Sequence, residues 1–280
     1  MTMGVRYMLI STFLFSFMQV LVKKLDYIPF FEIIFFRAII SFFLAYGAIH
    51  KQNISPFGNN IKLLILRGLF GTASLTSFFY ALHHVPLASA ITIVNIKPLM
   101  ILLVAFFFLK EKVNWWQWLC FGLSFIGIAV VKGFDTRIDT LGLLSVLGAA
   151  GFAAVAHTLV RLLRKTDYPN VIIFYFTLVT LPIILPFTIY YWKMPEGFDW
   201  LMLISIGVIT HFGQLFLTKA YQSEEMAKVS NIYYLGIVFA VAYGYFYFNE
   251  IYSLETVLGL LLVVGGVLLN MRFQGKTKVV

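Results

Sequence analysis

The segment LASAITIVNIKPLMILLVAFFFLKE at residues 87–111 returns, in part, 139 residues later as MAKVSNIYYLGIVFAVAYGYFYFNE at residues 226–250. Both copies have alanine at their second position and glutamate at their last. The same offset relates Gly127 to Gly266. An offset that stays nearly constant along the chain indicates two copies of one structural unit.

The amino-acid composition is that of an integral membrane protein. Of its 280 residues 61% are apolar and 12% are charged, and the mean hydropathy is +0.90, far above that of a soluble domain. Continuous apolar runs predict helices, since backbone groups in lipid must be satisfied within one segment. Ten stretches approach or reach the roughly 17–25 residues that cross a bilayer core: 7–22, 33–49, 63–82, 87–109, 113–131, 140–160, 168–192, 200–218, 229–248 and 254–271.

These ten predicted spans divide into five for each copy. An odd number makes the two copies enter the membrane in opposite senses, which is the inverted-repeat plan of many secondary transporters. We therefore predict an all-α integral membrane protein of ten transmembrane helices in two inverted five-helix repeats. The first repeat covers residues 1–132, the second covers 139–272, and 273–280 form a cytoplasmic tail. The first span belongs to the repeat, so we expect a retained helix rather than a signal peptide.

The net charge of +9 follows the positive-inside bias and does not require a nucleic-acid partner. With the N-terminus inside, inner segments carry thirteen Lys and Arg residues and outer segments carry five. We expect a multi-pass protein of the cytoplasmic or plasma membrane, with both termini in the cytoplasm. Its expected partners are the lipid bilayer and a small-molecule substrate, and it is expected to be a monomer or a homodimer.

The sequence contains no pattern typical of a metal site, an enzyme active site or an ion channel. Cys120 is the single cysteine and lies inside a span, and His83 and His84 have no cysteine or carboxylate nearby in sequence to complete a metal site. A membrane enzyme needs a cluster of acids, bases or metal ligands, and a channel needs a more polar lining. We therefore predict no enzyme activity, no cofactor and no metal, with the enzyme and the channel as alternatives of another class.

Lys97 is the strongest candidate for the substrate site. About 13 residues, or roughly 20 Å of helix, separate it from Lys110 at the inner edge, which is too far for a lysine to reach water. An ammonium facing lipid at this depth would cost several kcal/mol, so Lys97 must face the bundle interior. Pro98 weakens the helix at the same depth, and the aligned Gly236 permits bending or close approach. The alternative is a structural role in which Lys97 donates to loosened carbonyl groups.

Arg37 and Arg67 lie within spans but only about 7–8 Å from a charged residue at the membrane edge. Either arginine could extend to the headgroups or bind the substrate, and the two readings stay open. All twelve carboxylates fall in loops or at helix ends, so no acidic residue neutralises the three cations within the spans. The cavity should carry a positive potential, which favours an anionic group on the substrate.

Polar residues at helical spacing predict a lined path between the copies, with interhelical hydrogen bonding as the competing explanation. The substrate-binding candidates on these stripes are Gln19, Asn95, Gln214, Asn231 and Tyr234. On an ideal helix Asn95 and Lys97 are about 200° apart, so they share a face only if the break at Pro98 rotates one of them. His157 and His211 are candidates for proton coupling, because their unperturbed pKa lies near physiological pH.

The run from Leu66 to Val131 resembles one unit of the EamA repeat of the drug/metabolite transporter superfamily. The matching elements are Arg67-Gly68, Gly71, Tyr80-Ala81-Leu82, Pro86-Leu87-Ala88, Pro98, Leu109-Lys110-Glu111-Lys112 and Gly127, and the second copy keeps Ala220-Tyr221 and Glu250. The resemblance covers nearly the whole chain. It implies a central cavity lined by spans one to four and six to nine, peripheral spans five and ten, and alternating exposure as the halves rock.

Members of this superfamily carry amino acids, nucleotide sugars, purines, sugars, drugs and organic anions, so the resemblance leaves the substrate open. Lys97 also departs from the small or polar residue usual before the proline. Together with the charge argument, the sequence predicts a secondary transporter of a small organic metabolite, anionic or zwitterionic rather than cationic, that works by alternating access. An exporter of amino acids or of diverse hydrophobic or drug-like compounds is the alternative within transport.

Overall fold

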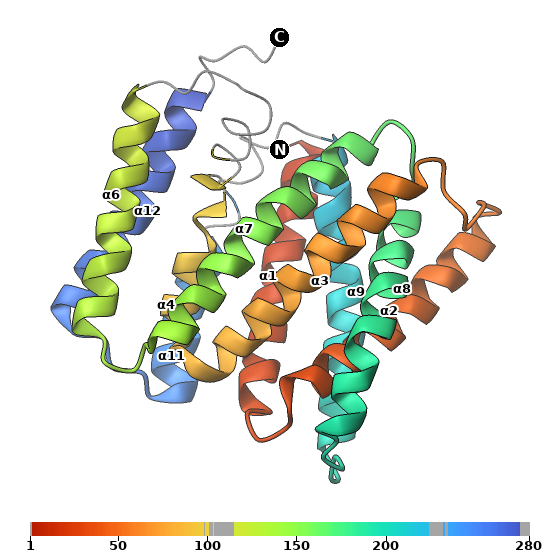
Figure 1. Ribbon diagram of the computed structural model, residues 1–280, viewed down its shortest axis with the longest axis horizontal. Helices are drawn as coiled ribbons and strands as arrows, with labels where there is room; N and C mark the ends of the chain where they lie inside the picture. The colour runs from red at the N-terminus through yellow and green to blue at the C-terminus, as the bar shows by residue number, and fades with distance from the viewer. Residues whose placement is uncertain are drawn as a thin grey trace.

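The computed structural model describes residues 2–97, 99, 100, 103, 115–223, 232 and 235–274. These residues form ten α-helices and no strand (Figure 1). The helices of the first half are α1 (Met3–Lys24), α2 (Phe30–Lys51), α3 (Ile61–His84), α4 (Leu87–Val94) and α6 (Trp115–Phe134). Those of the second half are α7 (Thr140–Leu163), α8 (Pro169–Tyr190), α9 (Asp199–Ser223), α11 (Leu235–Phe248) and α12 (Leu254–Gln274).

Seven of these helices are long and apolar enough to cross a membrane, and α11 and the Leu254–Asn270 part of α12 are shorter apolar helices. The fourth predicted span corresponds to α4 and the residues after it, most of which lie outside the described part of the chain. The fold is therefore the predicted all-helical membrane bundle of two five-helix repeats. Five of the ten described helices belong to each repeat.

The pair α6 and α12 shows how the two repeats are related. Gly127 packs against the backbone of Gly259, and the Ser124 hydroxyl donates to the Val263 carbonyl oxygen at 3.2 Å. Gly266 in turn packs against the backbone at Cys120. Residue numbers fall along α6 as they rise along α12, so the two helices are antiparallel. Ser124 and Val263 are related by the 139-residue offset, and the same offset exchanges the Gly127–Gly259 contact with the Cys120–Gly266 contact, as a two-fold axis running across both helices requires.

The same axis exchanges the contact between α1 and α9 with the contact between α7 and α3, and both are among the most extensive contacts of the bundle. The Ser11 hydroxyl donates to the Gly213 carbonyl oxygen at 2.8 Å, and the Ser74 hydroxyl donates to the Ala149 carbonyl oxygen at 2.9 Å. Ser74 and Gly213 are 139 residues apart, and Ser11 and Ala149 are 138 apart. The two hydrogen bonds therefore occupy equivalent places, with donor and acceptor exchanged between the repeats.

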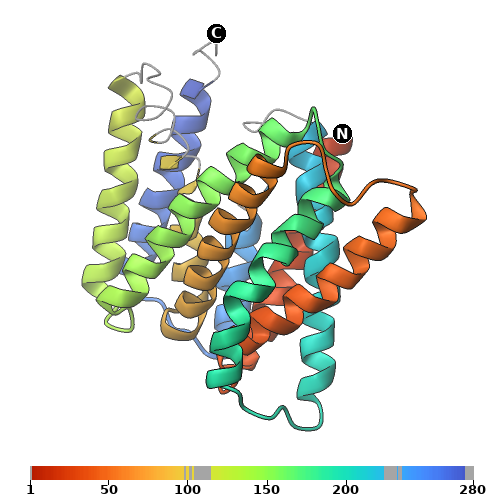
Figure 2. The ribbon, with the colours of Figure 1, turned by 45° about the vertical axis from the view of Figure 1, so that its right-hand side comes forward.

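An axis across the helices makes the repeats inverted. In Figure 1, α1 runs away from the side marked by the N-terminus, whereas its counterpart α7 runs toward that side. The first turn of α1 and the last turn of α12 lie on the same side of the bundle. Figures 1 and 2 also place α6 and α12 together at one edge, away from the centre.

On the side opposite the termini, Glu250 joins the two repeats. Its carboxylate accepts a hydrogen bond from Lys23 Nζ at 2.5 Å and from the Leu87 backbone N–H at 2.9 and 3.1 Å, and a further one from the Tyr252 hydroxyl. Leu87 is the first residue of α4, so the carboxylate also satisfies a helix N-terminus. One side chain of the second repeat thus holds the end of α1 and the start of α4.

The close approach of α6 and α12 predicts a glycine requirement at Gly127. A Cβ there would lie 2.7 Å from the Gly259 oxygen and from the Val263 nitrogen, which are backbone atoms. Gly127→Ala should therefore destabilise the folded protein by about 1–3 kcal/mol, measured as a lower midpoint of thermal unfolding in detergent. Gly122 lies on the same helix with no atom within 4 Å of its would-be Cβ, so Gly122→Ala is the matched control and should lose nothing. Equal midpoints for both variants would contradict this packing.

The Glu250 network predicts a pH-dependent stability. Burial alone would raise the pKa of the Glu250 carboxyl, but the charge of Lys23 and hydrogen bonds from Lys23, Tyr252 and the Leu87 N–H lower this pKa below its ordinary value. A lowered pKa in the folded state contributes stability that is present above the unfolded value and is lost as pH falls through the folded value. Glu250→Gln should cost about 1–3 kcal/mol near neutral pH, and the cost should shrink below about pH 4. A cost that stays constant with pH would exclude the ionic contribution.

Candidate functional site: a central cavity on the two-fold axis

A cavity of about 110 Å³ lies in the middle of the bundle, between the two repeats. Since a single water needs roughly 10–15 Å³ of such space, the cavity holds several waters or a small organic group. Its described walls come from α1, α2, α3, α4 and Lys97 in the first repeat and from α7, α8 and α9 in the second. Helices α6, α11 and α12 contribute none of the lining among the described residues.

The lining residues show that this cavity lies on the two-fold axis. Several of them come in pairs that are 139 residues apart, one from each repeat. These pairs are Met18 with His157, Arg37 with Phe176, Leu75 with Gln214, and Phe78 with Leu217. A space bounded by both members of exchanged pairs must straddle the axis that exchanges them.

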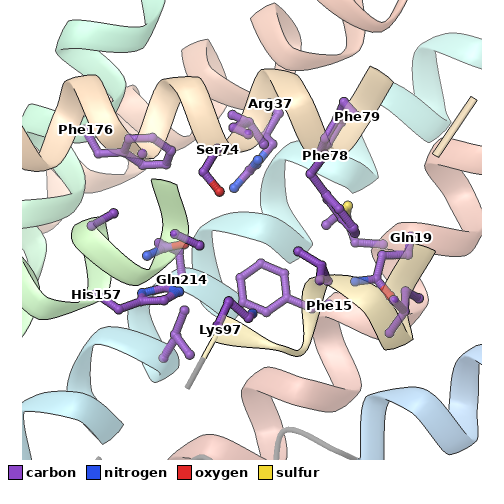
Figure 3. A pocket seen from close by; sticks show the side chains of 18 of the residues that line it. Phe15, Gln19, Arg37, Ser74, Phe78, Phe79, Lys97, His157, Phe176 and Gln214 are labelled. Atoms are coloured by element: carbon purple, nitrogen blue, oxygen red, sulfur yellow. The ribbon is translucent and has the colours of Figure 1, made fainter. Parts of the chain in front are cut away.

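Lys97 enters the cavity from the stretch that follows α4. The helix ends at Val94, and the next turn tightens, since the Ile96 N–H donates to the Ile93 oxygen three residues back at 3.1 Å. Proline at position 98 has no N–H to donate to the Val94 carbonyl oxygen four residues back, which accounts for a break at this point of the sequence. Lys97 is only 9% exposed and lines the cavity beside Val94. Figure 3 shows its side chain near those of Phe15 and Gln214.

Arg37 and Arg67 also lie in the cavity rather than at the membrane edge. Their exposed fractions are 6% and 3%, so neither side chain extends to the headgroup level. Both guanidinium groups stand over the ring of Phe176, with the Cζ atom 5.9 Å from its centroid for Arg37 and 4.4 Å for Arg67. Arg37 also lies 5.6 Å from the centroid of Phe79. Aromatic faces thus stabilise both cations without a carboxylate in the described lining.

Small residues of α3 allow this arrangement. Gly68 packs against Val179 of α8, where a Cβ would lie 2.7 Å from the valine side chain. The Thr72 and Thr180 hydroxyls lie 2.7 Å apart, and Thr180 also donates to the Phe176 carbonyl oxygen at 2.7 Å. Helix α3 therefore approaches α8 closely enough to bring Arg67 onto the Phe176 ring.

The remaining polar candidates divide into those inside the cavity and those outside it. Gln19, Gln214 and His157 line it. His211 does not, because its Nδ1 atom hydrogen-bonds the Ser41 hydroxyl at 3.1 Å and so links α9 to α2. Asn95 is buried but is not part of the described lining, whereas Lys97 is, as their angular separation on an ideal helix leads one to expect.

Comparison with known proteins agrees with this architecture. The EamA-like transporter family matches the chain twice, over residues 2–132 and 140–272. The chain belongs to the EamA-like transporter family. It is therefore a multi-pass membrane transporter of small metabolites and not an enzyme.

Relatives of this transporter act on different solutes. It is 30% identical to the pseudopaline exporter CntI of Pseudomonas aeruginosa over 93% of each chain. It is 31% identical to solute carrier family 35 member G1 of Mus musculus, covering 94% of this chain and 76% of the relative. It is 29% identical to the S-adenosylmethionine uptake transporter of Rickettsia prowazekii, covering 84% and 80%. A crystal structure with 16% identity superposes on 98% of the chain with a TM-score of 0.69, which supports the fold.

Some predicted site residues of this EamA-like transporter fall outside the described part of the chain, namely Pro98, Asn231 and Tyr234. Gly236 is the second residue of α11 and is buried. A Cβ at Gly236 would lie 3.6 Å from the Thr12 side chain, which is an ordinary contact. The bending or close approach that Gly236 permits stays a prediction.

Phe176 lines the cavity, although the sequence does not single it out. It lies in an apolar span, where an aromatic residue has no distinguishing pattern. The repeat offset could have found it, since position 176 is the counterpart of Arg37 and the pair faces across the axis. Phe78 and Phe79 line the cavity as well. Among the described residues no group of three or more His, Cys, Asp or Glu side chains could hold a metal ion.

Proposed function

We propose that this EamA-like protein is a secondary transporter that moves a small organic metabolite with an anionic or zwitterionic group by alternating access through the central cavity. The substrate contacts Lys97, Arg37 and Arg67, and Gln19 and Gln214 supply neutral hydrogen bonds. The observation that supports this proposal is the convergence of three cationic side chains on one cavity whose described lining contains no Asp or Glu. Such a lining has a positive potential in a low-dielectric setting, where charge attracts strongly.

The pairing of the two repeats supports alternating access. Most long helices pack against a helix of the other repeat, as α1 with α9, α2 with α8 and α3 with α7. Rocking one repeat against the other therefore widens the bundle on one side of the cavity and narrows it on the other. The Glu250 contacts with Lys23 and Leu87 lie on the side opposite the termini, and we propose that they close that side.

We propose that both termini lie in the cytoplasm and that the transporter resides in the cytoplasmic or plasma membrane. The excess of Lys and Arg in the connections on the terminal side supports this orientation. The relatives include both an exporter and an uptake transporter, so the direction of transport does not follow from the family.

Export of amino acids or of diverse hydrophobic compounds is the second candidate function. The aromatic lining favours it, since Phe15, Phe78 and Phe79 offer an apolar surface beside the cations. A neutral aromatic substrate would compete with the transported solute and would be indifferent to loss of the Lys97 charge. An anionic substrate requires that charge.

The central prediction concerns Lys97. In reconstituted vesicles, Lys97→Gln should lower the uptake of an anionic substrate by about tenfold or more, which corresponds to the loss of about 1.4 kcal/mol of binding. Lys193→Gln is the control, because Lys193 is an exposed residue of the α8–α9 connection. Its Nζ atom donates to the backbone carbonyl oxygen of Tyr27. Uptake of an anionic substrate that is unchanged in Lys97→Gln would remove Lys97 from the substrate site.

Proton coupling can be tested on the two membrane histidines. If transport responds to an imposed pH gradient, His157→Ala should weaken this response, because His157 lines the cavity. His211→Ala should instead lower the thermal stability by about 1 kcal/mol through loss of the Ser41 hydrogen bond, with the gradient response kept. A response that survives in His157→Ala and disappears in His211→Ala would reverse the two roles.

A further inference from the structure

Arg67 differs from an ordinary buried arginine in its hydrogen bonding. It is 3% exposed, and its Nε and Nη1 atoms have no hydrogen-bond partner among the described residues. A guanidinium has two donor edges, one with Nε and one with Nη1, so each edge contains a nitrogen without a partner. The Phe176 ring stabilises the charge from its face and leaves the in-plane N–H groups unsatisfied. Burying such donors is costly unless an acceptor is bound to them.

Gly71 makes room for this group. It lies one helical turn after Arg67, and a Cβ at this position would be 2.1 Å from Arg67 Nη1 and 2.9 Å from the Phe176 ring. Any side chain at position 71 would therefore displace the guanidinium or the ring. Gly71 itself lines the cavity, so the approach to Arg67 Nη1 is from the cavity.

A second unsatisfied nitrogen belongs to a residue that lines the same cavity from the other repeat. The Nδ1 atom of His157 is buried and has no hydrogen-bond partner among the described residues. It can donate one hydrogen bond when it carries the proton. Arg67 on α3 and His157 on α7 thus both line the cavity and have nitrogens without a hydrogen-bond partner among the described residues, and the complementary ligand is an acceptor with negative charge.

We infer that the substrate presents a planar or tetrahedral oxyanion, a carboxylate or a phosphate, to the guanidinium of Arg67, with His157 as a second donor and Gly71 as the residue that makes room for the guanidinium. This inference rests on the proposed function and makes it more specific, because it assigns hydrogen-bonded recognition to one arginine. A positive potential alone would be served equally well by lysine. Paired donation to an oxyanion requires arginine.

The test measures dissociation constants for the full chain purified in detergent. The probes are benzoate, succinate and 3-phenylpropionate, each beside its neutral amide, together with inorganic phosphate. Binding is followed by the shift of the unfolding midpoint, since a ligand that binds only the folded state raises it. At least one oxyanion should bind the parent protein about tenfold more tightly than its amide or, for phosphate, should bind measurably.

Arg67→Lys keeps the charge and should weaken binding of that oxyanion by about tenfold or more. Arg161→Lys, at an exposed position of α7, is the matched control and should bind as the parent does. Gly71→Ala keeps Arg67 itself and should also weaken binding, so it decides the matter if Arg67→Lys fails to fold. Binding by phosphate alone, with the same dependence on Arg67, would identify a phosphate rather than a carboxylate.

Unchanged binding in Arg67→Lys or Gly71→Ala would overturn the inference, as would equal affinity for a carboxylate and its amide or no binding by any oxyanion. These failures can be told apart from failure of the proposed function. Uptake of an anion that depends on Lys97 but not on Arg67 would overturn the inference alone. Uptake of cationic solutes in preference to anionic ones would overturn the proposed function as well.

Discussion

The free energy of placing positive charge inside a membrane controls the organisation of this bundle. An ammonium or guanidinium facing lipid near the bilayer centre costs several kcal/mol, and three such groups lie within the spans. The structure reduces that cost by turning Arg37, Arg67 and Lys97 inward, where each is at most 9% exposed. Aromatic faces then stabilise both arginines. A polar cavity in the middle of an apolar bundle is the consequence, and the helices around it must pack accordingly.

Packing between the repeats meets this demand with small residues and few hydrogen bonds. Without a hydrophobic driving force between helices in lipid, close contact of small residues and interhelical hydrogen bonds hold them together. Gly127 and Gly266 allow backbone contact at the edge of the bundle, and single serine hydroxyls join α1 to α9 and α3 to α7. The ion pair between Lys23 and Glu250 adds an ionic contact between the repeats on the side opposite the termini.

The repeat and the charges made much of this architecture predictable from sequence. The 139-residue offset and the apolar spans suffice for the inverted fold, since an odd number of crossings leaves no other arrangement. The depth of Lys97 along its helix required an inward side chain. Distance along a helix was a poor guide for Arg37 and Arg67, because a cation close to the membrane edge can point either way. Only the three-dimensional packing distinguishes them.

Contacts between the two repeats could not be predicted from the sequence, and the reason is different. Helical periodicity reveals which residues share a face, but not which face of a second helix they meet. The hydrogen bond between His211 and Ser41 joins α9 to α2 across 170 residues of sequence. Nothing in the sequence around either residue identifies the other as its partner. Histidine in a span therefore suggested coupling equally for His157 and His211, although their surroundings differ.

The site departs from the symmetry of its scaffold, and this departure has a physical reason. Arg37 and Phe176 occupy equivalent positions and face each other across the axis, with the Arg37 Cζ atom 5.9 Å from the ring centroid. An arginine at both positions would bring two like charges together in a low-dielectric interior, at a considerable cost. Phenylalanine at the second position turns that repulsion into a cation–π contact and also accepts Arg67. The counterparts of Arg67 and Lys97 are Ile206 and Gly236, so all three cavity cations come from the first repeat. A symmetric pair of repeats thus encloses a one-sided distribution of charge, and this asymmetry orients a substrate that carries its own charge at one end.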